Sequence, residues 1–169
     1  MADDVRGDDI INGQEIEDRI EELRDDLGLD RIEEIKTELE DLETERERFD
    51  QTDPENQTRL DEIIDETQAL TVERDGLIAA QDDGDLEELA QLQAFVEEAE
   101  GYADDRVRNT VFIRESHFTD YAQELAEDIG AIKEGAGWPN NCIDWDKAAS
   151  ELKIDYTSAD LDGVTYYFR

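Results

Sequence analysis

The sequence predicts an α+β protein in which an acidic helical stalk, residues 13–100, precedes a small α+β head domain, residues 101–169. Two observations predict this division. Residues 1–100 contain 37 acidic and 9 basic residues, whereas the rest of the chain contains 14 and 7. Of the aromatic residues, only Phe49 and Phe95 lie in the first part. The two parts therefore differ enough in composition to be separate structural units.

The stalk is expected to start after a flexible acidic leader, residues 1–12. Apolar residues then recur at steps of three and four, the spacing of a helix with one narrow apolar seam. A five-residue step across Gly28 interrupts this spacing, so we expect the supercoil to be interrupted or the helix to bend there. The seam consists of Ile16, Ile20, Leu23, Leu27, Ile32, Ile35, Leu39 and Leu42.

A second helix is predicted after the turn-forming sequence DQTDPENQT, residues 50–58. The simplest arrangement of the two helices is an antiparallel helical hairpin with charged residues on both outer faces. A single narrow seam buries little apolar surface, so a lone hairpin would be only marginally stable. We therefore expect self-association through the seam, and the sequence leaves open whether the stalk is an antiparallel hairpin or a parallel coiled coil.

The head is predicted to consist of short elements ending in a C-terminal β-hairpin. The run TVFI, Thr110–Ile113, is typical of a short buried strand. Ser116 and Asp144 are candidate N-caps for two helices, the first of which ends at Gly130. Asp162-Gly163 is a turn dipeptide that joins two β-rich segments. Together these elements predict a small α+β module.

Alternation along the last segment, VTYYFR, assigns its side chains to two faces of a strand. Val164, Tyr166 and Phe168 share one face and are expected in the core. Tyr167 points to the other face and is the better candidate for an exposed contact. Aromatic side chains thus supply the burial that a small core needs.

We expect a noncatalytic protein without cofactor or metal. His117 is the only histidine, and its neighbour Asp120 at i+3 is as readily a surface pair as a catalytic one. Cys142 is the only cysteine, which excludes an intramolecular disulfide, and we expect a buried structural thiol. The sequence contains no P-loop, no GxGxxG and no nucleophile elbow.

The net charge is the most unusual property of the sequence: 51 acidic and 16 basic residues give −35. Acidity spread over the whole chain is typical of a cytoplasmic protein of a halophile, in which molar salt screens the repulsion. The alternative is that the carboxylates imitate DNA phosphates. No Lys/Arg cluster and no long apolar stretch occurs, so neither direct nucleic-acid binding nor a membrane span is expected.

Two segments of the head carry a resemblance to known proteins: FTDYAQELAEDIGAI, residues 118–132, and WPNNCIDWDKAASELKIDYTSADLDGVTYYFR, residues 138–169. Over residues 86–169 the chain resembles small phage and prophage proteins of unknown function. Over residues 110–169 it is similar to the C-terminal region of ArdA antirestriction proteins, where a DYA-EL helix precedes an IDY/IDW segment, a short helix and a β-hairpin. The chain has a helical stalk where that family has its preceding domains.

The ArdA resemblance implies a function in protein binding, because those proteins are acidic dimers that mimic bent DNA and occupy the DNA groove of Type I restriction enzymes. It implies that acidic residues of the matched helices stand in for phosphates, namely Asp120, Glu124, Glu127, Asp128, Asp144, Asp146 and Glu151. The predicted function is thus an accessory protein of a halophilic virus, plasmid or prophage that inhibits restriction enzymes. The alternative is an oligomeric assembly protein whose acidity reflects only halophilic adaptation.

If the acidity is an adaptation to salt, the melting temperature should rise from about 0.1 M to about 1 M KCl, over which the Debye length falls from roughly 10 Å to 3 Å. Thermal unfolding followed by circular dichroism measures this change. A melting temperature that stays flat or falls over the same range would contradict the halophilic interpretation.

Overall fold

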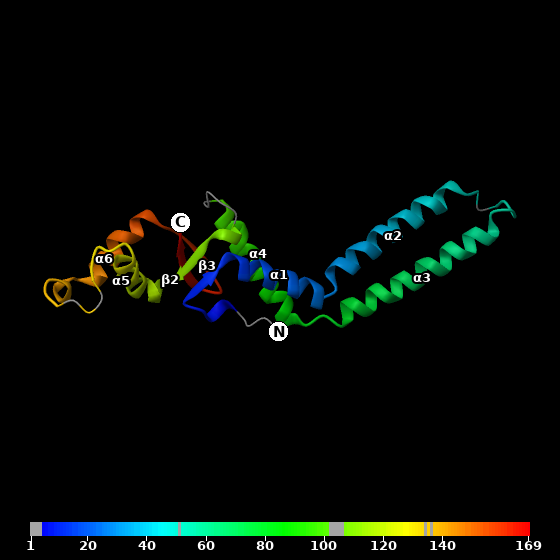
Figure 1. Ribbon diagram of the computed structural model, residues 1–169. Coiled ribbons are helices and arrows are strands. Elements are labelled where there is room, and N and C mark those ends of the chain that lie inside the picture. The colour runs from blue at the N-terminus through cyan, green and yellow to red at the C-terminus, as the bar shows by residue number, and fades with distance from the viewer. Residues whose placement is uncertain (1–4, 51, 102–106, 134, 136) are drawn as a thin grey trace. The chain divides into compact units, whose positions relative to one another are not determined.

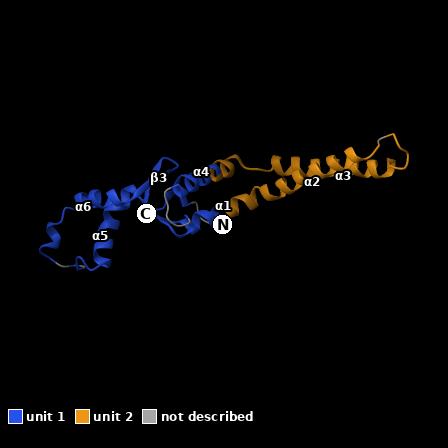
Figure 2. Cartoon of the chain, turned by 90° about the horizontal axis from the view of Figure 1, so that it is seen from above, with its two compact units in different colours: residues 1–20, 90–169 blue, residues 21–89 orange. Residues whose placement is uncertain are grey.

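The computed structural model describes residues 5–50, 52–101, 107–133, 135 and 137–169. In these residues it contains six α-helices and one four-stranded antiparallel sheet, which confirms the predicted α+β class (Figure 1). The chain divides into two compact units, residues 1–20 with 90–169 and residues 21–89 (Figure 2). The boundaries thus differ from the predicted division near residue 100, because both ends of the predicted stalk belong to the unit that contains the sheet.

The sheet combines the first strand of the chain with three strands from its C-terminal part. The strand order is β1-β2-β4-β3, and all neighbours are antiparallel. Asp162-Gly163 lies between the last two strands, which pair along their full length from Thr157↔Phe168 to Leu161↔Val164. The strands are β1, Ile10–Asn12; β2, Val111–Arg114; β3, Thr157–Leu161; and β4, Val164–Phe168.

Residues 5–12 contribute to the core of this unit, which differs from the flexible leader expected over residues 1–12, of which residues 1–4 lie outside the described part of the chain. Ile11 is fully buried and lies opposite Phe112 in the β1–β2 pair. The Tyr166 hydroxyl donates a hydrogen bond to the carbonyl oxygen of Asp8 at 2.9 Å. The backbone N–H of Gly13 donates to Thr110 at 2.8 Å. These contacts fix the segment, because pairing satisfies backbone groups of the edge strand and Ile11 is buried.

One face of the sheet carries an aromatic core to which helix α4, Asp83–Glu100, contributes. The ring of Phe95 lies 4.8 Å from Phe112 and 6.0 Å from Tyr166, measured between centroids, and Phe112 lies 5.1 Å from Phe168. All four side chains are at most 1 % exposed. Tyr166 and Phe168 therefore occupy the core positions that alternation predicts, whereas Val164, expected in the core with them, is only half-buried.

The opposite face of the sheet is covered by α5, Phe118–Asp128, and α6, Trp145–Leu152 (Figure 1). Tyr167 is half-buried there, with its ring centroid 5.2 Å from that of Phe118 and the Lys153 ammonium 4.5 Å above it. The expectation that Tyr167 forms an exposed contact is therefore wrong. Alternation separates the two faces of a strand correctly, but here both faces are covered.

One of the two predicted helix caps in this unit is confirmed. Asp144 caps α6, because its carboxylate accepts a hydrogen bond from the backbone N–H of Lys147 at 3.1 Å. Ser116 does not cap α5. It lies within a short 3-10 turn, so α5 begins two residues later at Phe118, with His117 at the N-cap position and no side-chain cap.

The second unit is built mainly from α2, Leu29–Arg48, and α3, Gln57–Ala79, which lie side by side in both views (Figures 1 and 2). Helix α1, Gly13–Asp26, ends just before Gly28, whose φ of 63° is left-handed and separates α1 from α2. The interruption predicted at this glycine is therefore present. None of the helices in the described part of the chain is both long and apolar enough to cross a membrane.

The N-terminal anchoring can be tested at Gly13, where a Cβ would overlap the carbonyl oxygen of Val107. We expect Gly13→Ala to destabilise the protein by about 1–3 kcal/mol, as overpacking does. Gly76→Ala in α3 is the control, because nothing lies within 4 Å of a Cβ there; it should stabilise by about 0.5–1 kcal/mol through helix propensity. Urea unfolding measures both, and an unchanged Gly13→Ala midpoint would contradict the close packing.

Candidate functional site

Three of the predicted phosphate-mimicking residues are brought together on α5. Asp120, Glu124 and Glu127 follow at i, i+4 and i+7, so they lie on one helical face. With His117 they line a surface groove of about 450 Å³, called the α5 groove below. The His117 Nδ1 atom lies 3.7 Å from an oxygen of Asp120. Asp128 is exposed at the end of the helix and does not line the groove.

The three predicted acidic residues of α6 have local partners instead. Asp144 serves as the helix cap. An Asp146 oxygen accepts a long hydrogen bond of 3.5 Å from the hydroxyl of Thr119 on α5. Glu151 lies 4.0 Å from the ammonium of Lys147 one turn earlier. None of the three lines the α5 groove, so the structure does not bring the seven predicted acids into one row.

Cys142, the other potentially reactive side chain of the head, differs from expectation in its exposure. Cys142 is exposed rather than buried, because it lies in a 3-10 turn of the loop before α6, and its Sγ atom is 3.6 Å from the side-chain oxygen of Asn141. Within the described residues, no group of three or more His, Cys, Asp or Glu side chains is arranged to hold a metal ion.

In the second unit, Arg31 of α2 contacts three carboxylates. Its Nε and Nη2 atoms donate to the two oxygens of Glu73 on α3 at 2.8 and 3.1 Å. Its Nη1 atom donates to Glu38 at 2.9 Å and to Glu34 at 3.3 Å. The bidentate pair connects the start of α2 to the end of α3, and it lowers the pKa of Glu73 by hydrogen bonding.

Arg59 of α3 also contacts three carboxylates, one of them through two hydrogen bonds. It donates to both oxygens of Glu45 on α2 at 2.8 Å, and its Nη1 atom donates to Glu66 at 3.1 Å and Glu62 at 3.2 Å. The hydrogen bond from Arg59 likewise lowers the pKa of Glu45. We call the two groups the Arg31 cluster and the Arg59 cluster. Since each spans both helices near opposite ends, α2 and α3 run in opposite directions.

The two clusters match because α2 and α3 contain the same pattern 28 residues apart. RIEEIKTE, residues 31–38, corresponds to RLDEIIDE, residues 59–66, and the match continues with Leu42 and Leu70. The bidentate partners Glu45 and Glu73 are also 28 residues apart. The helix pair is therefore approximately two-fold symmetric in its ion pairs.

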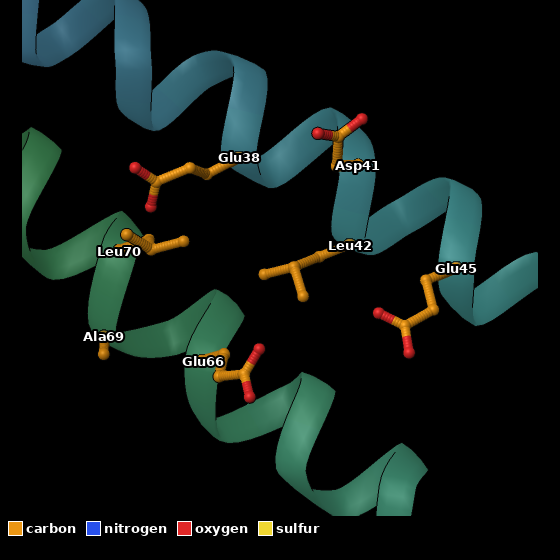
Figure 3. Close-up of a pocket in the computed structure, with 7 residues that line it drawn as sticks. All are labelled: Glu38, Asp41, Leu42, Glu45, Glu66, Ala69 and Leu70. Carbon is orange, nitrogen blue, oxygen red and sulfur yellow. The ribbon is translucent and has the colours of Figure 1, made fainter.

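A groove between α2 and α3 lies beside these clusters, with a volume of about 440 Å³. We call it the α2–α3 groove. Figure 3 shows Leu42 and Leu70 directed into the space between the helices, with carboxylates around them. The lining consists of Leu42, Ala69, Leu70, Glu38, Asp41, Glu45 and Glu66. The arrangement is an apolar floor with an acidic rim.

The structure divides the predicted seam into two sets by exposure. Buried are Ile16, Leu23, Leu27 and Ile35, each at most 3 % exposed. Half-buried are Ile20, Ile32, Leu39 and Leu42. Ile35 and its counterpart Ile63 on α3 are both fully buried, so they are covered within a single chain. Leu39 and Leu42 line grooves and retain accessible surface.

The arginine clusters and the α2–α3 groove do not follow from the apolar spacing of either helix alone. They arise because charged side chains of one helix pair with those of the other. The 28-residue repeat of Arg, Glu and Leu was nevertheless readable, and it is the signal that could have identified both clusters. Comparisons of the chain with protein-family models, with curated proteins and with solved structures give no match.

The bidentate pairs predict a specific pH dependence. The pKa values of Glu45 and Glu73 lie below their ordinary 4.5 in the folded protein, so their contribution to stability is present above about pH 4.5 and is lost as the pH falls below it. We expect the stability difference between wild type and Glu45→Gln/Glu73→Gln to shrink as the pH is lowered through this range. Urea unfolding followed by circular dichroism measures the difference.

Acidification also relieves repulsion among the many carboxylates, so a charge-matched control is needed. Glu33→Gln/Glu47→Gln removes the same charge from exposed positions of α2. For this control, the difference from wild type should lack the acid-dependent loss. If both double variants show the same pH profile, the bidentate pairs do not contribute specifically.

Proposed function

We propose that the protein is a noncatalytic acidic accessory protein of a halophilic virus, plasmid or prophage, and that its α5 groove binds a basic surface of a protein partner. The single observation that carries the proposal is the row of Asp120, Glu124 and Glu127 along one face of α5, with Asp120 and Glu124 exposed. By resemblance to ArdA, the partner is the DNA-binding surface of a restriction enzyme.

The spacing of the row is compatible with mimicry of a nucleic-acid strand. Steps of four and three residues correspond to about 6 and 4.5 Å of helix rise. Phosphates of one B-DNA strand follow at about 3.4 Å of axial rise. The rise between neighbouring carboxylates of the row is therefore between one and two times the rise between neighbouring phosphates. A protein surface that neutralises phosphates would meet negative charge at similar intervals.

The partner's chemistry follows from the charge. A DNA-binding surface is lined with Lys and Arg, and it attracts polyanions over a distance that salt shortens. A chain with a net charge of −35 repels DNA and is steered toward such a surface. No catalytic group is required for inhibition of this kind, because occupation of the binding surface is sufficient.

A second candidate function is an oligomeric assembly protein that associates through the helical stalk. The observation that favours it is the accessible apolar surface of α2 and α3: Leu39 and Leu42 are half-buried, and Ile64 and Val72 are 51 % and 66 % exposed. Leu42 is the seam position at which a substitution tests self-association, because it is only half-buried. A polar residue at a buried seam position would instead unfold the chain.

The antirestriction proposal predicts that expression of the protein raises the transformation efficiency of unmodified plasmid DNA in a restricting haloarchaeal host. A restriction-deficient host should show no rise. The variant Asp120→Asn/Glu124→Gln/Glu127→Gln should lose most of the effect, because it removes the row while the helix remains.

A matched variant, Glu33→Gln/Glu40→Gln/Glu47→Gln, removes equal charge from exposed positions of α2 and should retain the effect. If soluble wild-type protein gives no rise in the restricting host, the antirestriction proposal is wrong. A sedimenting oligomer at about 1 M KCl that dissociates in Leu42→Gln would then support the assembly function.

A further inference from the structure

We propose that the α2–α3 groove is a docking site for a basic amphipathic helix of a partner protein. The site lies in the second compact unit and shares no residue with the α5 groove, so this inference goes beyond the proposed function and does not depend on it. The occupant would place apolar side chains on Leu42, Ala69 and Leu70 and its cationic side chains against the rim.

The groove offers apolar surface that the chain itself does not cover. Leu42 and Leu70 are half-buried and directed into the space between the helices (Figure 3), and Ala69 is an exposed residue of the same lining. The volume of about 440 Å³ lies within the roughly 300–1,000 Å³ typical of ligand pockets. A groove between two long helices accommodates a third helix, whose anchors at i, i+3, i+4 and i+7 form one apolar stripe.

The rim keeps excess negative charge although Arg31 and Arg59 lie beside it. Its carboxylates Glu38, Glu45 and Glu66 belong to the two arginine clusters, each of which combines one guanidinium with three carboxylates and so has a net charge of −2. Asp41 adds a further carboxylate at the groove, and it is exposed. A ligand that brings cations to both sides of an apolar stripe would therefore complement the whole groove.

In dilute salt, charge also disfavours a second copy of this chain as the occupant. The helices α2 and α3 of another copy would carry the same acidic pattern on either side of their apolar residues. Carboxylates would then face carboxylates across the contact, which destabilises an interface. The complementary ligand is a helix with Lys or Arg flanking Leu or similar residues.

The test uses a fluorescent synthetic peptide of about four helical turns, with Leu on one helical face and Arg on both flanks. A scrambled peptide of the same composition controls for nonspecific attraction to a polyanion. We expect the amphipathic peptide to bind the full-length protein about tenfold or more tightly than the scrambled peptide, with both weakening as KCl is raised. Fluorescence anisotropy measures both affinities.

The variant Ala69→Arg locates the site, because it places a bulky cation in the groove at an exposed position. It should weaken binding of the amphipathic peptide about tenfold or more. The matched variant Ala79→Arg makes the same charge change at an exposed position of α3 outside the groove and should have an effect below about twofold. Circular dichroism confirms that both variants are folded.

Three outcomes would overturn the proposal. Equal affinity for the amphipathic and scrambled peptides would show that charge alone attracts them. Equal weakening by Ala69→Arg and Ala79→Arg would place binding elsewhere. A wild-type dimer in sedimentation that Ala69→Arg alone dissociates would identify a second copy as the occupant. Loss of the α5 row should leave peptide affinity unchanged, which separates failure here from failure of the antirestriction proposal.

Discussion

The constraint on which the second unit depends is the ratio of acidic to basic side chains. With 51 acids and 16 bases, each basic residue has about three carboxylates to neutralise. Arg31 and Arg59 show the same ratio locally, since each forms ion pairs with three carboxylates. A guanidinium suits this task because its five donors have a fixed planar geometry, whereas an ammonium is a point charge. The chain correspondingly contains twelve Arg and four Lys.

The sheet-containing unit is stabilised mainly by aromatic side chains and not by arginine clusters. Its sheet is short, but both faces are covered, by the aromatic core around Phe95 on one side and by α5 and α6 on the other. Large rings bury much area per residue, so few residues suffice for a core. The acids of this unit can therefore remain at its surface, and three of them line the α5 groove.

The sequence predicted correctly those features that depend only on residues close together in the chain. The Asp144 cap and the interruption at Gly28 follow from spacings of a few residues, and the structure contains both. Strand β1 was missed because only Ile10 and Ile11 are apolar there and the paired strand lies about a hundred residues later. The partial burial of Tyr167 and the arginine clusters were missed for the same reason, since both depend on contacts between elements distant in sequence.

Because α2 and α3 share the 28-residue repeat, the α2–α3 groove has nearly equivalent halves. Glu38 corresponds to Glu66 and Leu42 to Leu70, so much of the groove is the same when viewed from either end. A helix, however, has a direction. Only positions where the repeats differ, such as Asp41 against Ala69, can distinguish its two orientations. The orientation of a bound helix at this surface therefore depends on the few residues that differ between the two repeats, and not on the residues that the repeats share.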